Sequence, residues 1–170
     1  MTYCEGKDAL RSSPSDDSDT AAARAFTAGA ASGHDPVMAQ MEGAALRVLV
    51  GENNSDLAMT LNFLLNDEPD MHCVSMASST AEVLRALEEH SPNAFILDLS
   101  LDDGSSLPLI GQLRQRLPQS AIVVFTGHKN EMLSQRCVQA GANAVVVKTE
   151  GFEELTGALR RAAEQGWSPP

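Results

Sequence analysis

Short apolar runs alternate along the chain with segments that repeat apolar residues at helical spacing. Runs of about four to eight apolar residues between turn residues are typical of strands buried on both faces. Five such strands are predicted, at Leu46–Val50, Met71–Met76, Ala94–Ser100, Ala121–Phe125 and Ala144–Val147. The second run is the least apolar, so we expect this strand nearer an edge of the sheet.

Five helices are predicted from apolar side chains that recur three and four residues apart. The first should begin at an N-cap of Asp56 or Ser55. Residues 79–82, Ser-Thr-Ala-Glu, fit a capping box for the second, and Pro108 fits the first turn of the third. Gly141 is expected to end the fourth. The apolar stripes are Leu57, Leu61, Leu64 and Leu65; Val83, Leu84 and Leu87; Leu109, Ile110, Leu113 and Leu117; residues 132–140; and Leu155, Ala158, Leu159 and Ala162.

This alternation predicts an α/β fold with one parallel sheet. Parallel strands need crossover connections, and these are right-handed, so the helices must cover both faces of the sheet. The expected domain spans residues 45–166, and residues 167–170 are expected to form an exit or linker.

Residues 1–44 differ in composition from the rest of the chain. Residues 12–19 are polar and acidic, and residues 21–33 are rich in Ala and Gly. Neither part can bury enough apolar surface to offset the entropy of ordering, so we expect a disordered or poorly ordered tail. A second interpretation is that Met38 or Met41 is the true start, in which case the residues before it are not translated.

Composition limits the partners and the compartment. With 170 residues, 43% of them hydrophobic, the chain can bury one domain. Its net charge of −11 argues against direct nucleic-acid binding and favours a basic partner or a divalent cation. Cys4, Cys73 and Cys137 form no disulfide or metal pattern, and the last two are expected in the core. Without a transmembrane run or a secretory signal, we expect a cytoplasmic protein in a reducing compartment.

Polar side chains follow four of the predicted strands. Glu52 and Asn53 follow the first, Asp98 lies at the end of the third, Thr126 follows the fourth and Lys148 the fifth. The carboxyl ends of parallel strands share one edge of a sheet, where ligands bind. We therefore expect these side chains to meet in a shallow pocket.

This set of groups suits phosphoryl chemistry. The carboxylates Glu52 and Asp98 need a cation between them, and carboxylate, amide and carbonyl oxygens are hard ligands suited to Mg²⁺. Asp98 would attack a phosphoryl group whose charge the metal and Lys148 offset, while Thr126 donates a hydrogen bond to it. The expected product is an aspartyl phosphate.

From about Leu46 to Gln165 the sequence resembles a receiver domain of the two-component response-regulator family. Four motifs carry the resemblance, in order along the chain: residues 52–54 after an apolar strand, the stretch 97–104, the segment 125–127, and the segment 140–142 followed by Val147-Lys148. The resemblance implies a doubly wound, flavodoxin-like, three-layer fold with five helices and five strands in the order 2-1-3-4-5.

The resemblance also implies a role for each matching residue. Asp98 corresponds to the phospho-acceptor, and Lys148 and Thr126 correspond to the residues that contact the phosphoryl group. Glu52 and Asn53 correspond to the acidic pair that holds Mg²⁺, together with Asp98 and the backbone carbonyl of Ser100. Gly104 fits the turn after the acceptor, and His128 is expected to line the pocket as a loop residue.

Four positions depart from the family pattern. Asn53 replaces the second acid, so Mg²⁺ affinity should be weaker. Thr149 replaces the proline that usually follows the lysine, and Asp102 replaces a common loop proline; Asp102 and Asp103 are expected to form a solvated turn. Val145 replaces the aromatic residue that moves with Thr126, so any switch must be read out differently.

The first functional hypothesis is a phospho-receiver of a phosphorelay, charged on Asp98 by a histidine kinase or phosphotransfer protein. The resemblance implies signalling through the fourth helix, fifth strand and fifth helix to a downstream protein or output domain, and allows a homodimer through that face. Enzymatic activity beyond self-phosphorylation and autodephosphorylation is not expected.

The alternative is a phosphorylation-independent interaction module, a pseudo-receiver on the same fold. A different enzyme is disfavoured, because the chain lacks a glycine-rich phosphate loop and a nucleophile elbow.

Overall fold

A computed structural model of the chain describes residues 45–127 and 130–169. The predicted tail at residues 1–44, the alternative starts at Met38 and Met41, Cys4 and the loop residue His128 lie outside the described residues.

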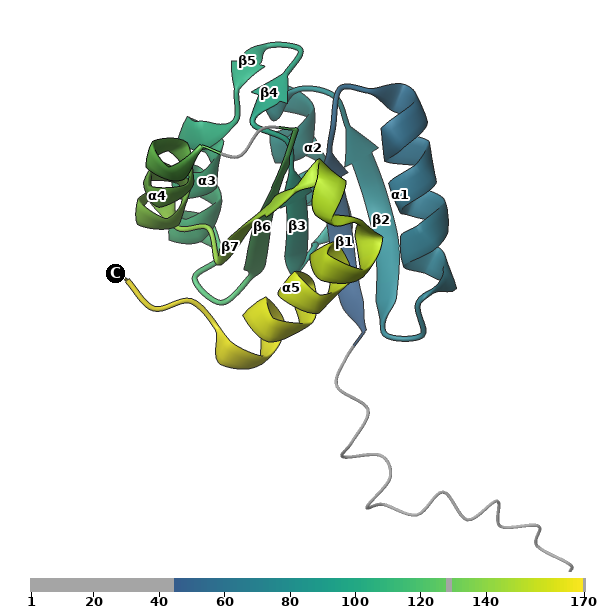
Figure 1. The fold of residues 1–170 in the computed structure, drawn as a ribbon. Helices are drawn as coiled ribbons and strands as arrows, with labels where there is room; N and C mark the ends of the chain where they lie inside the picture. The colour runs from purple at the N-terminus through teal and green to yellow at the C-terminus, as the bar shows by residue number, and fades with distance from the viewer. Residues whose placement is uncertain (1–44, 128–129, 170) are drawn as a thin grey trace, which may run out of the picture. The chain divides into compact units, whose positions relative to one another are not determined.

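Five parallel strands form the sheet, in the order β2-β1-β3-β6-β7 (Figure 1). Numbered among themselves along the chain, these strands have the predicted order 2-1-3-4-5, and β2 lies at an edge as expected. The bounds are Leu46–Gly51 for β1, Met71–Ala77 for β2, Ala94–Leu97 for β3, Ala121–Thr126 for β6 and Ala144–Val147 for β7.

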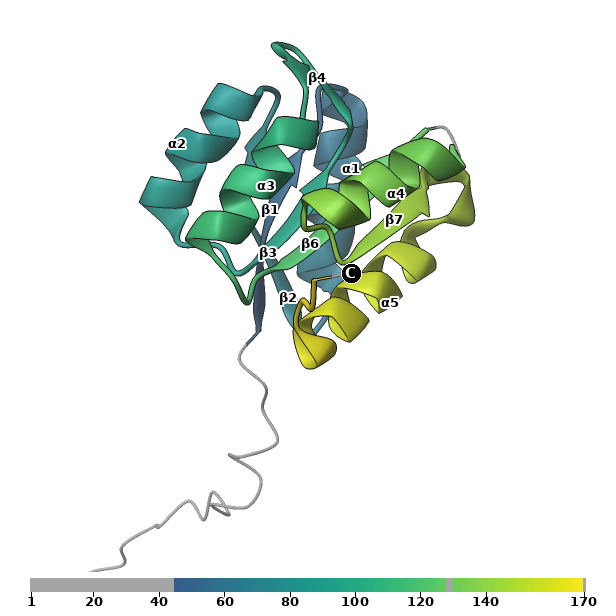
Figure 2. The same cartoon turned by 90° about the vertical axis from the view of Figure 1, so that its left-hand side faces the viewer.

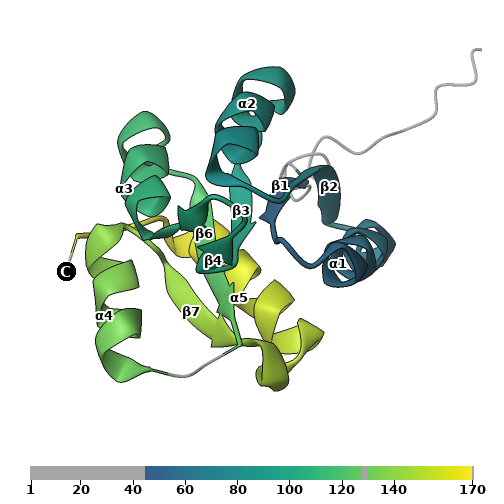
Figure 3. The same ribbon diagram turned by 90° about the horizontal axis from the view of Figure 1, so that it is seen from above.

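Helices cover both faces of the sheet, which confirms the three-layer α/β prediction (Figures 2 and 3). Helices α1 and α5 pack on one face, and α2, α3 and α4 pack on the other. Residues in one strand alternate between the two cores: Val48 and Val50 face α1 and α5, whereas Leu49 faces the opposite layer. The bounds are Ser55–Asp67 for α1, Thr80–His90 for α2, Leu107–Arg116 for α3, Glu131–Ala140 for α4 and Phe152–Gln165 for α5.

The observed helix ends agree with some of the predicted caps and differ from others. The N-cap of α1 is Asn54, not Asp56 or Ser55, because the Asn54 side chain accepts a hydrogen bond of 3.0 Å from the Leu57 amide. Ser79 caps α2 as predicted, but the Glu82 side chain of the expected capping box accepts a hydrogen bond from the Ser78 amide instead of the Ser79 amide. Gly141 ends α4 with φ of 119°, and a Cβ there would lie 2.7 Å from the Cβ of Arg114, so both conformation and packing require glycine.

The third strand is shorter than predicted, because β3 ends at Leu97 and leaves Asp98 just beyond the sheet. The chain then forms a small antiparallel hairpin, β4 (Ser100–Leu101) with β5 (Gly104–Ser105), which the hydrophobic pattern does not predict. Figure 1 shows this hairpin beyond the edge of the sheet where the strands end. A single 3₁₀ turn, η1 (Lys148–Glu150), follows β7 and contains the exposed Thr149.

Arg114 joins four segments at the opposite edge of the domain. Its buried guanidinium donates hydrogen bonds to the carbonyls of Leu117, Pro118, Ser120 and Gly141 and to the side-chain oxygen of Asn143. The ring of Trp167, in the segment expected to be an exit or linker, lies 5.1 Å from the guanidinium carbon. Trp167, which follows α5 and Gly166, is therefore packed against the domain.

Two further expectations concern burial. Cys73 and Cys137 are buried, as predicted. None of the helices in the described part of the chain has the length and apolar character needed to cross a membrane.

Candidate functional site

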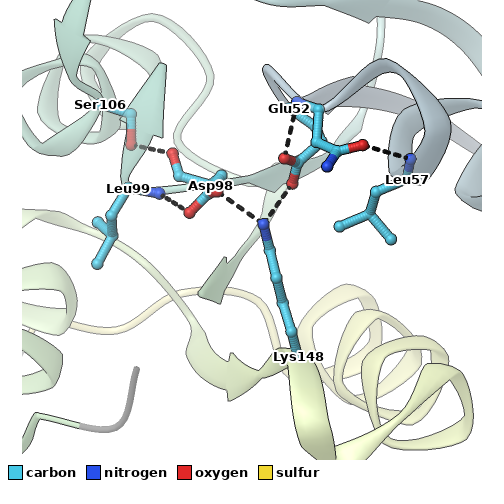
Figure 4. A network of polar contacts seen from close by, with 7 residues as sticks. Glu52, Leu57, Asp98, Leu99, Ser106 and Lys148 are labelled. Atoms are coloured by element: carbon cyan, nitrogen blue, oxygen red, sulfur yellow. Dashed lines mark hydrogen bonds and ion pairs between the residues drawn. The ribbon is translucent and has the colours of Figure 1, made fainter. Parts of the chain in front are cut away.

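The ends of three strands bring Glu52, Asp98 and Lys148 together (Figure 4). Lys148 Nζ lies 2.7 Å from Glu52 Oε2 and 2.7 Å from Asp98 Oδ2. These residues follow β1, β3 and β7, and they are separated by up to 96 positions in the sequence. The expectation that strand-end groups meet at one edge is thus met by these three side chains.

Glu52 is the most buried charged side chain of the site, with a 2% exposed side chain. Its second carboxylate oxygen, Oε1, accepts a hydrogen bond of 3.1 Å from the Asn54 amide. Both oxygens therefore have donors, which is what a buried carboxylate needs in order to remain charged. Glu52 holds the Lys148 ammonium from the interior of the domain.

Asp98 is held in place but remains accessible, with a 13% exposed side chain. Its Oδ1 accepts a hydrogen bond of 2.6 Å from the Leu99 amide, and its own amide donates to the Gly51 carbonyl at 2.8 Å. The carbonyl of Asp98 accepts a hydrogen bond of 2.6 Å from the hydroxyl of Ser106. The carboxylate is thus oriented by the backbone and can be approached from solvent.

The two carboxylates keep Lys148 protonated. Burial lowers the pKa of the Lys148 ammonium, but its hydrogen bonds to Asp98 and Glu52 outweigh burial, so its pKa lies above the ordinary value of 10.5. With two carboxylates and one ammonium, the three side chains carry a net charge of −1.

We expect the stabilising effect of Lys148 to disappear in alkali. A raised pKa in the folded state contributes stability below the unfolded value, near 10.5, and this contribution is lost as the pH rises through the folded pKa. Wild type should exceed Lys148→Gln by about 2 kcal/mol in unfolding free energy at pH 8. Urea titrations from pH 8 to pH 12 should show this difference shrinking above pH 10.5; a constant difference would contradict the ion-pair interpretation.

Thr126 lies at the same edge, at the end of β6, but it stays outside the hydrogen-bonded network. It is buried and lies beside Val147 in the sheet register, one residue before Lys148. Its hydroxyl makes no hydrogen bond within the described ranges. Val145 is half-buried in β7 and packs in the layer of α2, α3 and α4.

Asn53 and Ser100 also lie at this edge, and both are exposed. In the part of the chain that the structure describes, neither side chain takes part in the network around Lys148. Sequence reasoning missed Ser106, which is fully buried and turns its hydroxyl to Asp98 instead of capping α3. Serine before a helix predicts a cap, so no local signal pointed to this role.

The donors at this edge are of the chemical kind that Mg²⁺ binds. Within residues 45–127 and 130–169, no three His, Cys, Asp or Glu side chains gather closely enough to hold a metal ion. The available hard donors are the carboxylates of Glu52 and Asp98 and neutral oxygens from Asn53 and Ser100. Lys148 already contacts one oxygen of each carboxylate, so a bound cation would share these carboxylates with an ammonium.

Comparisons with known proteins agree with this fold. The family model of the response regulator receiver domain matches residues 48–160. The transcriptional regulatory protein KdpE of Mycobacterium tuberculosis is 32% identical over 119 residues, which cover 63% of this chain and 52% of KdpE. The oxygen regulatory protein NreC of Staphylococcus epidermidis is 25% identical over 116 residues, covering 68% of this chain and 53% of NreC. The chain thus spans about half the length of these curated relatives.

Solved structures share the fold. The signal receiver domain of NarL from Mycobacterium tuberculosis has a TM-score of 0.66 at 20% identity, covering 72% of this chain and 98% of that one. A LuxR-family two-component response regulator from Aurantimonas sp. SI85-9A1 has a TM-score of 0.67 at 21% identity, covering 72% and 88%. The family match extends over most of the domain and includes every residue of the Lys148 network. The chain therefore belongs to the response regulator receiver domain family.

Proposed function

We propose that this chain is a phospho-receiver that accepts a phosphoryl group on Asp98. The observation that carries the proposal is the position of Lys148 Nζ, 2.7 Å from a partly exposed carboxylate at the end of the central strand. An ammonium at this distance can stabilise the charge of an incoming phosphoryl group. Glu52, bonded to the same ammonium, fixes its position.

The transfer uses Asp98 as the nucleophile. A carboxylate oxygen forms a bond to phosphorus while the bond from phosphorus to the donor's imidazole nitrogen breaks. The electron pair of that bond leaves with the imidazole, which takes a proton from water. Lys148 remains beside the new acyl phosphate, and the Leu99 amide keeps the carboxylate oriented through its 2.6 Å hydrogen bond.

Receiver domains bind Mg²⁺ in their acidic pocket, and the donors here support a weak version of that site. Glu52, Asp98, Asn53 and the Ser100 carbonyl would hold the ion. When bound, Mg²⁺ supplies positive charge that offsets the charge of the phosphoryl group. Asn53 provides an oxygen but no charge, so affinity should be lower than with two acids.

The proposed partners are those of a phospho-receiver. Donors would be a histidine kinase or a phosphotransfer protein, and the signal would leave through α4, β7 and α5 to a downstream protein or output domain, or through a homodimer on that face. Thr126 would follow the phosphoryl group, with Val145 transmitting little of that movement. The chain would act in the cytoplasm as an acceptor, with self-phosphorylation and autodephosphorylation as its only reactions.

A second candidate is a pseudo-receiver that binds its partner without phosphorylation. The observation in its favour is that Lys148 already contacts both carboxylates, whose net charge with it is only −1. Lys148 thus offsets one of the two negative charges without a metal. This candidate predicts that Asp98→Asn keeps full partner affinity and output.

Intact mass spectrometry after incubation with Mg²⁺ and acetyl phosphate tests the proposal. Wild type should gain one phosphoryl group, and Asp98→Asn should gain none, because an amide of the same shape is not a nucleophile. Asp102→Asn removes the same charge four residues away and should behave as wild type. Absence of uptake by wild type, or equal uptake by Asp98→Asn, would reject the phospho-receiver and leave the pseudo-receiver.

A further inference from the structure

We propose that Asp103 is a positioning residue, which holds the acceptor loop (residues 98–106) in place by capping helix α2 from across the fold. The effect on phosphorylation rests on the proposed function of Asp98, whereas the tether itself does not. The loop leaves the sheet at Asp98, passes through the β4–β5 hairpin with Ser100, and enters α3 after Ser106.

The hairpin is too small to hold its own position. Only two residue pairs join its strands, and an isolated hairpin of ordinary length is at best marginally stable in water. At its base, Ser106 donates hydrogen bonds to the carbonyls of Asp98 and Leu99, and Leu101 is buried. The tip needs a separate anchor.

That anchor is the first turn of α2. Asp103 Oδ1 accepts a hydrogen bond of 2.8 Å from the Thr80 amide, and Oδ2 accepts bonds of 2.6 Å from the Thr80 hydroxyl and 3.2 Å from the Ala81 amide. Beside it, the Asp102 amide donates to the Ser78 carbonyl at 2.9 Å. Four hydrogen bonds thus connect the hairpin tip to the start of α2.

The free amides of α2 show why a carboxylate is needed there. The first amides of a helix have no partner within the helix. The Ser79 hydroxyl accepts a hydrogen bond from the Glu82 amide, and the Glu82 carboxylate accepts one from the Ser78 amide. The amides of Thr80 and Ala81, the first two residues of the helix, bond to Asp103. A negative charge at a helix N-terminus also interacts favourably with the helix dipole.

The ionisation of Asp103 agrees with this role. Hydrogen bonds from the Thr80 hydroxyl and then from the Thr80 amide lower the pKa of the Asp103 carboxyl below its ordinary value. The carboxylate is therefore charged at neutral pH. By fixing the tip, it fixes the path of the chain through Leu99 and Ser100, and hence the orientation of the Asp98 carboxylate and of the carbonyl that would hold the metal.

Asp102 provides a matched control. It is the adjacent residue, it is exposed and it carries the same charge. Within the described residues its side chain has no hydrogen bond or ion pair, so its loss removes one charge and no tether.

The test compares Asp103→Ala and Asp103→Glu with Asp102→Ala in the full chain. Amide hydrogen exchange followed by NMR should show about a fivefold or larger loss of protection at Thr80 and Ala81 in Asp103→Ala, with shifted resonances for Leu99 and Ser100. Asp103→Glu should recover part of the protection, and Asp102→Ala should match wild type. Equal exchange in Asp103→Ala and Asp102→Ala would overturn the tether.

Phosphorylation kinetics separate positioning from simple stability. Under conditions where urea titration shows every variant folded, Asp103→Ala should label more slowly with acetyl phosphate and Mg²⁺ than Asp102→Ala does. An unchanged rate with lost protection would overturn the positioning role and leave only a helix cap. If wild type takes up no phosphoryl group, the proposed function fails, and the exchange data still decide whether the tether exists.

Discussion

Asn53→Asp should tighten Mg²⁺ binding by about 10- to 100-fold. The substitution changes the charge of the site from −1, given by Glu52, Asp98 and Lys148, to −2. In water, a divalent cation gains about 2 kcal/mol from a further unit charge about 4 Å away, which corresponds to roughly 30-fold in affinity. Because Asn53 is exposed, the charge is added with little desolvation cost, so the attraction decides the sign.

Titration of both proteins with Mg²⁺, followed by NMR of the amides at the strand ends, measures this change. Gln115→Glu adds the same charge at an exposed position of α3 and should leave the affinity unchanged at moderate ionic strength. Equal or weaker binding by Asn53→Asp would mean that residue 53 is not a ligand. In that case, a weak affinity for Mg²⁺ would have a cause other than the missing charge at residue 53.

Arg114→Met should lower the unfolding free energy by about 3–5 kcal/mol. Arg114 is 6% exposed, and the substitution leaves the carbonyls of Ser120 and Gly141 without their donor, while the Asn143 oxygen keeps only its hydrogen bond from the Ile122 amide. Methionine has a similar length, so most of the cost comes from these lost hydrogen bonds. Burial lowers the pKa of the Arg114 guanidinium, because the protein interior disfavours its positive charge. The hydrogen bonds of the guanidinium stabilise that charge.

Urea denaturation monitored by fluorescence measures this effect. Trp167 is the only tryptophan of the chain and lies 5.1 Å from the Arg114 guanidinium, so the native emission of the variant should also change. Arg116→Met is the control: Arg116 is exposed, and its 3.0 Å ion pair with Glu88 should contribute no more than about 1 kcal/mol. A loss below 1 kcal/mol for Arg114→Met would contradict the role given to its hydrogen bonds.

The fold was predictable because its signals are local. Apolar runs and helical stripes lie within single elements, and the rule that parallel strands need crossovers converts their order into a layered sheet. The predicted bounds of β7 match the structure, and those of β1, β2 and β6 differ by one residue. The start of α1 was misplaced by one or two positions, because three neighbouring polar residues can each cap a helix and only the backbone selects Asn54.

The site was predictable in outline for a topological reason. Parallel strands end at the same edge, so a residue's position at a strand end indicates its neighbourhood without any distance being known. Glu52, Asp98 and Lys148 were identified in this way, and the structure places them in contact. Their bonding pattern, with the ammonium between the two carboxylates, depends on side-chain conformations that sequence order does not encode.

The sequence by itself thus determined the sheet, its helices and the residues at its carboxyl edge, because hydrophobic periodicity and connection rules act over short stretches of chain. Only the tertiary structure decided that Lys148 bridges Glu52 and Asp98, that Ser106 and Asp103 hold the acceptor loop, and that Arg114 is buried beside Trp167. These interactions join residues 8 to 96 positions apart. Each polar group has many possible partners along the chain, and packing of the whole domain selects one of them.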